Sequence, residues 1–126
     1  ATEAHASTLS FEFSSGAQRI VVNCGAGGQH KQWQDVLRAT AAHSTVTLAD
    51  LSTAFLIQHG IVRRLLGPRL LGGPEKIDTN RMQTPQGWSM TASHDAYLAQ
   101  YGFVIERMMS LSPQGLVLSG RDRLTP

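Results

Sequence analysis

Short segments in which apolar and polar residues alternate recur along this chain, and they restrict its fold more than any other feature. Successive side chains of a β-strand point to opposite faces of a sheet, so alternation predicts strands that are buried on one face. The segments that alternate, or that form short β-branched or apolar runs between turns, are 8–13, 19–24, 44–48, 51–56, 87–92, 102–111 and 115–119, and segment 76–84 is expected to be an exposed, polar strand. The first two flank a short glycine-containing turn and therefore predict a β-hairpin.

Turn signals separate these segments, and helical periodicity is scarce. Glycine, proline and serine gather at residues 14–17, 25–28 and 112–114, where they predict turns or loops. Apolar residues in 32–42 have a spacing that allows one or two helical turns, and residues 60–74 are expected to form a long loop or edge insertion. Many short strands joined by turns predict an all-β fold, an antiparallel β-sandwich with at most one short helix.

Composition places the chain among globular domains and excludes several functions. Its 126 residues are 41% hydrophobic and 16% charged, which is enough for one domain with a buried core. No apolar run is long enough to span a membrane. The formal net charge is only +2, and basic residues are spread along the chain, so nucleic-acid binding is not expected. The single cysteine, Cys24, excludes an internal disulfide.

The chain starts at Ala1, and no signal-like segment follows. We therefore expect residues 1–126 to be one domain of a longer polypeptide, or the product of processing. A sandwich separated from its neighbouring domain would expose an apolar face. Self-association of the isolated chain is expected for that reason.

The densest basic segment is Arg63-Arg64, with Arg69 following. A guanidinium group binds a carboxylate or sulfate through two parallel hydrogen bonds. Arg63 and Arg64 are therefore candidates for binding an anionic sugar. The alternative is a solvated loop, which is the usual setting of exposed charge.

Two histidines and an amide stand at the ends of predicted strands. His5 precedes the first strand, Asn23 lies at the end of the second, and His43 precedes segment 44–48. If these strands are neighbours, the three side chains can converge on a metal ion, since imidazoles and oxygen ligands suit zinc. An amide is a weaker, uncharged ligand. The alternative is a pair of hydrogen-bonded histidines at strand ends.

A second cluster follows the predicted strand at 87–92. A carboxylate such as that of Asp95 can orient an imidazole such as that of His94, and a nearby tyrosine, Tyr97 or Tyr101, can take part in proton transfer. The alternative is a turn in which Asp95 bonds backbone amides and both tyrosines are half-buried.

Several stretches together resemble the heparinase II/III-like polysaccharide lyases. Residues 4–13 are similar to the family segment His-x-His-Ala-Asp-x-Leu-Ser-Phe, and residues 19–25 to the following strand, which commonly ends in Asp-x-Gly. Residues 38–48 resemble the block Arg-x-x-x-x-His-Asn/Ser-Thr-Val/Leu, and residues 92–97 the element His-Asp-Gly-Tyr. Arg107 and Asp122 also fall at familiar places, so the resemblance covers almost the whole chain.

The resemblance implies an architecture and an activity. Family members join an amino-terminal α/α toroid to a large antiparallel β-sandwich, and this chain would be the sandwich alone. They cleave uronic-acid polysaccharides by β-elimination: the uronate carboxylate is neutralised, a base removes the neighbouring proton, and an acid protonates the leaving oxygen. The implied partners are an anionic polysaccharide and the upstream toroid, and the implied compartment is periplasmic or extracellular. A non-catalytic carbohydrate-binding or structural β-module is the alternative.

The resemblance also assigns positions for a metal. His5 matches the second histidine of the family segment, His43 matches the later histidine, and Asn23 matches the aspartate between them. In metal-bearing members these positions hold a structural zinc ion. A zinc site at His5, Asn23 and His43 is therefore implied, with an amide in place of a carboxylate.

The catalytic positions of the family are only partly matched. Glu3 stands where the family has the first histidine of His-x-His, and residues 23–43 contain no tyrosine, with His30 in that stretch instead. The acid and base of the reaction would then come largely from the toroid, and this chain alone is expected to be inactive. Within it, the candidates are His94, Tyr97 and His30.

Overall fold

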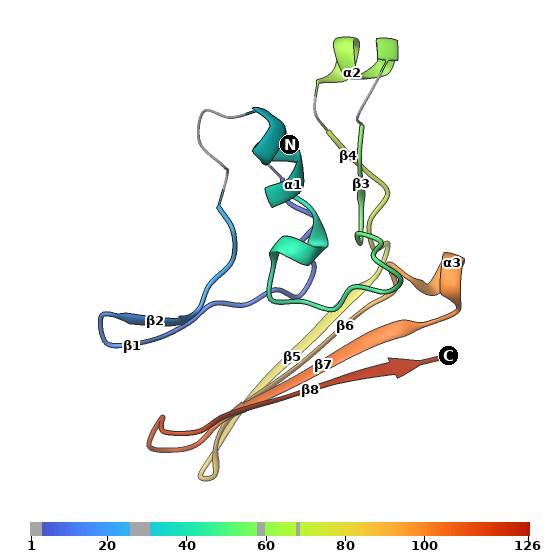
Figure 1. The fold of residues 1–126 in the computed structure, drawn as a ribbon. Helices are drawn as coiled ribbons and strands as arrows, with labels where there is room; N and C mark the ends of the chain where they lie inside the picture. The colour runs from blue at the N-terminus through green and yellow to red at the C-terminus, as the bar shows by residue number, and fades with distance from the viewer. Residues whose placement is uncertain (1–3, 26–30, 58–59, 68) are drawn as a thin grey trace. The chain divides into compact units, whose positions relative to one another are not determined.

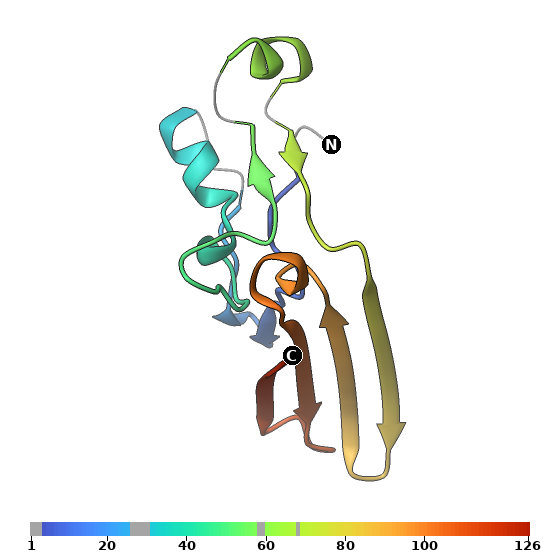
Figure 2. The same ribbon diagram turned by 90° about the vertical axis from the view of Figure 1, so that its right-hand side faces the viewer.

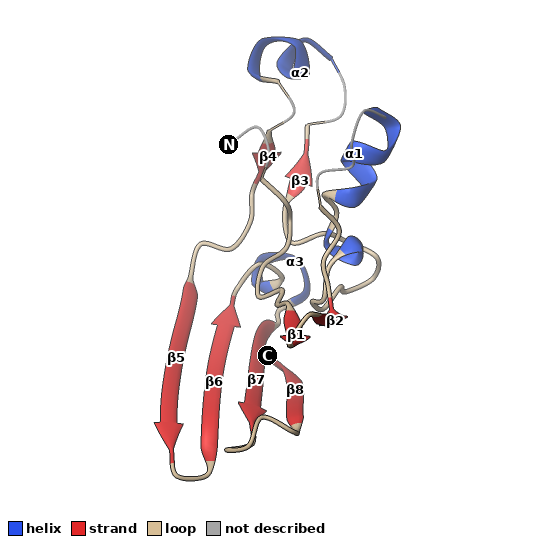
Figure 3. Cartoon of the chain, turned by 90° about the vertical axis from the view of Figure 1, so that its left-hand side faces the viewer, coloured by secondary structure: helices blue, strands red, loops and turns tan. Residues whose placement is uncertain are grey.

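A computed structural model describes residues 4–25, 31–57, 60–67 and 69–126 of the chain. These residues belong to two compact units, unit 1 over residues 1–73 and unit 2 over residues 74–126 (Figure 1). Sheets in both units are antiparallel, and the helices are short (Figure 3). The prediction of an all-β fold with antiparallel sheets is confirmed.

Unit 2 contains a four-stranded sheet in the order β5-β6-β7-β8 (Figure 2). The strands are β5 (Ile77–Thr84), β6 (Gly87–His94), β7 (Val104–Leu111) and β8 (Leu118–Thr125). Each pairs antiparallel with the next strand in sequence, without a bulge. The predicted strands at 76–84, 87–92 and 102–111 are confirmed here. The last strand, predicted at 115–119, lies at 118–125, so the prediction shares only residues 118 and 119 with it, and residues 115–117 lie in the connection before it.

The register gives this sheet two chemically different faces, since alternate residues of each strand point to the same side. One face, called the apolar face below, carries Trp88, Met90, Ala92 and His94 of β6 and, opposite them on β7, Leu111, Met109, Arg107 and Ile105. The other, called the hydroxyl face, carries Ser89, Thr91 and Ser93 of β6 beside Ser110, Met108 and Glu106 of β7. Ala92 and Ile105 are buried.

Two connections of unit 2 depend on glycine, one for close approach of the backbone and one for a left-handed helix end. Gly87, which begins β6, has φ +117°, and a Cβ atom placed there would collide with the backbone of Leu111 and Ser112. The β6–β7 connection contains α3 (Leu98–Tyr101), which ends at Gly102 in the left-handed conformation. The backbone angle of Gly87 suits only glycine, and the left-handed position of Gly102 favours it.

Unit 1 is built from smaller elements. The hairpin of β1 (Phe13–Ser15) and β2 (Gln18–Val21) turns at Gly16, whose φ is +57°. After it come α1 (Lys31–Leu37), the 3₁₀ turn η1 (Thr40–Ala42), β3 (Phe55–Leu56), α2 (Gly60–Leu66) and β4 (Leu70–Leu71). β3 and β4 form an antiparallel pair.

A buried threonine joins the loops of unit 1. Thr40 is fully buried, and its hydroxyl donates to the carbonyl oxygen of Ala6 at 2.6 Å and accepts from the amide of Thr53 at 2.8 Å. The amide of Thr40 donates to the hydroxyl of Ser52 at 3.1 Å. Nearby, Arg38 is buried and its Nε donates to the carbonyl of Ala4 at 2.7 Å. Buried polar side chains therefore connect the loops of this unit.

The predicted strand at 44–48 is wrong. Apolar and polar residues alternate there, but the segment forms no ladder of backbone hydrogen bonds with another strand. Its hydroxyl groups instead bond to a neighbouring loop. The hydroxyl of Ser44 donates to the carbonyl of Phe11 at 2.6 Å, and that of Thr45 donates to the carbonyl of Thr8 at 2.6 Å. Serine and threonine compete in this way with regular secondary structure.

Other strands of unit 1 are shorter than predicted. β1 starts at Phe13, so most of the predicted strand at 8–13 is loop, and β3 occupies only the end of segment 51–56. The predicted hairpin is confirmed, with β2 covering only part of segment 19–24.

The expectation of at most one short helix is also wrong, because the structure contains the short helices α1, α2 and α3. α1 lies where helical turns were predicted, but α2 lies inside segment 60–74, which was expected to be a loop. Its interior contains leucine and arginine, which favour helices. Gly60 and Gly67 bound it at φ +87° and +72°, angles that suit glycine at a helix end.

Candidate functional site

The two predicted metal-site histidines lie in contact within unit 1. His5 is in the loop before β1, and His43 directly follows η1. Nδ1 of His5 is 3.1 Å from Nε2 of His43, and the rings meet nearly edge to face at 77°. Their loops are tied together by the amide of Ala6, which donates to the carbonyl of Arg38 at 2.9 Å. Residues 38 positions apart in sequence are thus brought to one point.

This environment favours the neutral form of His43. Burial is the main cause that lowers the pKa of His43 below its ordinary value, and the neighbouring His5 lowers it further. The carbonyl of Leu37 acts in the opposite direction. A neutral imidazole retains a lone pair, which is the form that accepts a hydrogen bond or binds a metal.

Asn23 lies beside His43 in space but is occupied with other contacts. Its Oδ1 accepts hydrogen bonds from the amide of Ser44 at 2.8 Å and from the Ser44 hydroxyl at 3.0 Å. Its Nδ2 donates to the carbonyl of Phe11 at 3.0 Å. Asn23 therefore connects three loop segments through hydrogen bonds. Its side-chain oxygen is already bonded and is not free to bind a metal at the histidine pair.

The donors present fit a zinc ion only in part. Two nitrogens at the usual bond lengths on a tetrahedral zinc ion lie about 3.3 Å apart, close to the spacing of the histidine pair. A third ligand is needed for a stable site. Within the part of the chain that is described, no group of three histidine, cysteine, aspartate or glutamate residues could hold a metal. A zinc ion here would require Asn23 to release its hydrogen bonds.

The His94 cluster of unit 2 is built as a buried turn. His94 and Tyr97 are each only 1% exposed, and Nδ1 of His94 accepts a hydrogen bond from the amide of Ala96 at 3.2 Å. Nε2 of His94 therefore bears the proton. The Oδ1 of Asp95 accepts from the amides of Glu75 and Lys76 at 2.9 and 3.0 Å, as expected for the turn alternative.

Burial lowers the pKa of His94, and the positive charge of Arg107 lowers it further, while Asp95 raises it. The ring of Tyr97 lies 5.9 Å from that of His94 and 6.3 Å from that of Tyr101. Neutral, buried and packed against an aromatic ring, His94 has the surroundings of a core residue.

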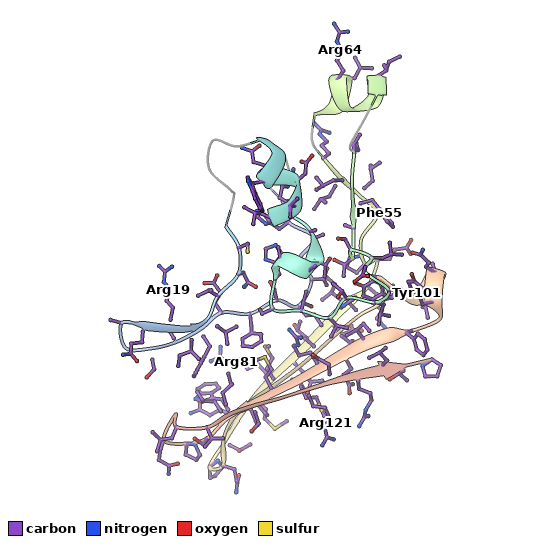
Figure 4. The ribbon with its side chains drawn as sticks, viewed as in Figure 1. Arg19, Phe55, Arg64, Arg81, Tyr101 and Arg121 are labelled. Carbon is purple, nitrogen blue, oxygen red and sulfur yellow. The ribbon has the colours of Figure 1, made fainter. Side chains whose placement is uncertain are left out.

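The predicted sugar-binding arginines belong to α2. Arg64 is exposed and points away from the helix (Figure 4). The side chain of Arg63 and the whole of His30 lie outside the residues that are described. Ile61 and Leu65, on the same helix, are more than three-quarters exposed. Cys24 is exposed and free.

Arg107 and Asp122, two of the positions that carry the family resemblance, are in contact. They face each other across β7 and β8 on the apolar face, where Nε and Nη2 of Arg107 donate to the two carboxylate oxygens at 2.7 and 2.8 Å. Arg81, on the same face, stacks over the ring of Trp88 at 4.3 Å. Asp122 lies beyond the predicted strand at 115–119, so the strand pattern gives no reason to pair it with Arg107.

The antiparallel sheets, carried by short strands and joined by polar turns, define an all-β domain. The family model described as Heparinase II/III-like, C-terminal, matches residues 1–126, and the chain therefore belongs to this polysaccharide lyase-related family. No curated protein and no solved structure matches the chain. None of the described helices is both long enough and apolar enough to cross a bilayer.

Proposed function

We propose that this chain is the β-sandwich domain of a polysaccharide lyase-like protein that cleaves uronic-acid polysaccharides by β-elimination. The observation that carries the proposal is the family match, which extends over residues 1–126. The contact between His5 and His43 supports it, because both stand at positions where the family has histidines. In this proposal an α/α toroid domain of the same protein precedes the sandwich.

The chemistry explains why the chain alone would be inactive. Removing the proton beside a uronate carboxylate is feasible only if the developing enolate charge is stabilised, and a base and an acid must flank the sugar. His94 and Tyr97 are buried to 1% exposure, which does not favour contact with a polymer. The toroid would then supply most of the reacting groups.

For the histidine pair we propose a supporting role in the parent protein. His5 and His43 would hold the loops after residue 4 and after η1 at a fixed distance, either through their hydrogen bond or through a zinc ion bound to both. When bound, zinc would supply a fixed positive charge and a rigid crosslink. Neither role requires His5 or His43 to transfer a proton.

A non-catalytic carbohydrate-binding module is the second candidate. The observation in its favour is the hydroxyl face of unit 2, where serine and threonine side chains line a surface hollow. Such a module would bind the polysaccharide and leave cleavage to another protein.

The decisive experiment incubates the full-length protein with alginate, heparin, heparosan and pectate and follows the ultraviolet absorbance of the unsaturated uronate product. The 126-residue chain alone and a neutral polymer of similar length, cellulose oligosaccharide, are the controls. We expect product from at least one uronate polymer with the full-length protein and none with the chain alone. Binding without any product across the panel would instead establish the second candidate.

A further inference from the structure

The hydroxyl face of unit 2 places hydroxyl groups in a straight row across three strands. Ser89, Ser110 and Ser119 are direct register partners on β6, β7 and β8. Neighbouring strands are about 4.8 Å apart, so the row advances by that distance from one hydroxyl to the next. The spacing is similar to the advance per sugar along a 1,4-linked pyranose chain.

The next row on this face adds an apolar group and a charge. Thr91, Met108 and Arg121 are register partners on the same three strands. Arg121 is exposed, and it makes no ion pair or hydrogen bond with another residue in the part of the chain that is described. The next arginine along β8, Arg123, is instead 3.8 Å from Glu106. Arg121 is therefore the guanidinium of this row that is available to a ligand.

The two rows line a shallow hollow of about 460 Å³. Its lining includes all six of these side chains, and Arg121 is the only charged residue among those that line it. Within the described part of the chain, the hydroxyl groups of Ser89, Thr91, Ser110 and Ser119 make no hydrogen bond, so each can donate to and accept from a ligand. Arg81 and Arg121 lie on opposite sides of the sheet (Figure 4).

We propose that this hollow is a binding site for a short stretch of a uronic-acid polysaccharide, separate from the histidine pair. Arg121 would bind the uronate carboxylate through charge-assisted hydrogen bonds, since a guanidinium matches the geometry of a carboxylate. The serine and threonine hydroxyls would exchange hydrogen bonds with sugar hydroxyls. Met108 would contact the apolar C–H face of a ring. The proposal rests on the proposed function for its ligand class.

The test titrates the 126-residue chain with an alginate tetrasaccharide and, in parallel, with cellotetraose, which has a similar length and no carboxylate. Calorimetry gives the dissociation constants, and amide chemical shifts show where each sugar binds. We expect binding of the alginate oligomer with shifts at residues 89, 91, 108, 110, 119 and 121, and at least fivefold weaker binding of cellotetraose.

Two variants within the site and one control variant on the opposite face separate this site from the rest of the sheet. Arg121→Gln should weaken alginate binding roughly five- to tenfold, the loss expected for one exposed charge-assisted hydrogen bond. Ser110→Leu fills the centre of the hollow and should weaken it at least as much. Arg81→Gln, on the opposite face of the same sheet, should change the dissociation constant by less than about twofold.

Unchanged binding by Arg121→Gln and Ser110→Leu, equal binding of both tetrasaccharides, or shifts confined to other residues would each overturn the proposal. Its failure is distinct from that of the lyase function. If the full-length protein with Arg121→Gln cleaves and binds like the unaltered protein, this site is wrong and the lyase function stands. If binding depends on Arg121 but no polymer is cleaved, the site stands and the lyase function is wrong.

Discussion

Arg107 and Asp122 form a two-pronged ion pair across neighbouring strands, with both hydrogen bonds at 2.8 Å or less. The arginine side chain is only 9% exposed, while that of the aspartate is 33% exposed. A buried guanidinium without its partner loses favourable charge interactions that water cannot fully replace. The pair therefore fixes β7 against β8 at the centre of the apolar face.

Replacing Asp122 alone should therefore be costly. We expect Asp122→Asn to lower the free energy of unfolding by about 2 to 3 kcal/mol, less than for a fully buried pair because the carboxylate is partly exposed. The double variant Arg107→Leu/Asp122→Leu should lose less than the single one, because it leaves no unpaired charge. Urea unfolding followed by circular dichroism measures both. A smaller loss for the single variant than for the double one would contradict this account.

Acid should destabilise the domain through His94. Its pKa is lowered in the folded state, chiefly by burial, whereas the unfolded chain has the ordinary value of about 6.5. Above pH 6.5 His94 is neutral in both the folded and the unfolded state, so the stability that its lowered pKa contributes is fully present. As the pH falls through about 6.5 toward the lowered folded pKa, the unfolded state binds the proton more readily and stability is lost.

The pH dependence is measured by unfolding in urea at several values between pH 5 and 8. His94→Phe should flatten the decline on the acid side, even if it also changes stability at neutral pH. His43→Gln is the matched control for the other histidine with a lowered pKa and should remove a separate part of the decline. An unaltered slope in both variants would exclude these histidines as its source.

Asn23 should determine whether zinc can bind. Asn23→Asp removes the Nδ2 donor to the carbonyl of Phe11 and sets a carboxylate against that oxygen, so we expect a loss of about 1 to 2 kcal/mol without metal. With zinc added, the charged oxygen should make the metal more stabilising than in the unaltered chain. Thermal melting with and without zinc measures both effects.

The control for this prediction adds His43→Gln to Asn23→Asp. If zinc binds the proposed set, the added zinc should no longer raise the melting temperature of the double variant. Zinc stabilisation that survives loss of His43 would place the metal elsewhere. A chelator should leave the melting of a zinc-free sample unchanged.

Gly87 should tolerate no side chain. Its φ of +117° and the collision of a Cβ atom with the backbone of Leu111 predict that Gly87→Ala lowers the free energy of unfolding by about 3 kcal/mol. Gly115→Ala is the matched control, because Gly115 also has positive φ but nothing lies within 4 Å of its Cβ position. Its loss should be near 1 kcal/mol. Equal losses in chemical unfolding would show that the close approach has no energetic effect.

Sequence alone predicted unit 2 far better than unit 1, and the reason is physical. In β6 the alternation of Trp88, Met90 and Ala92 with serine and threonine continues along a strand of eight residues, which pairs with β5 on one side and β7 on the other, so the strand is specified by many neighbours. In unit 1 the same pattern at 44–48 is overridden by two hydroxyl groups that bond to loop carbonyls. Hydrogen bonds of this kind join residues more than thirty positions apart, and local patterns carry no information about them.

The candidate site was predictable to a similar extent. Proximity of His5 and His43 followed from the family resemblance and not from spacing, since 38 residues separate them. The hydrogen bonds from Ser44 to Asn23 could not be predicted, because a side-chain amide can either bind a metal or hydrogen-bond to a neighbouring loop. The serine row across β6, β7 and β8 becomes visible only when the register is known.

The unbroken register of β7 has a consequence for how this sequence can change over time. A residue inserted or deleted near its middle would rotate every following side chain by half a turn. Ser110 would then point to the side of Trp88, and Met109 to the side of Arg121. Substitutions can accumulate in this strand one at a time, but a change of length would exchange its two surfaces at once, so length variation should be confined to the connecting turns.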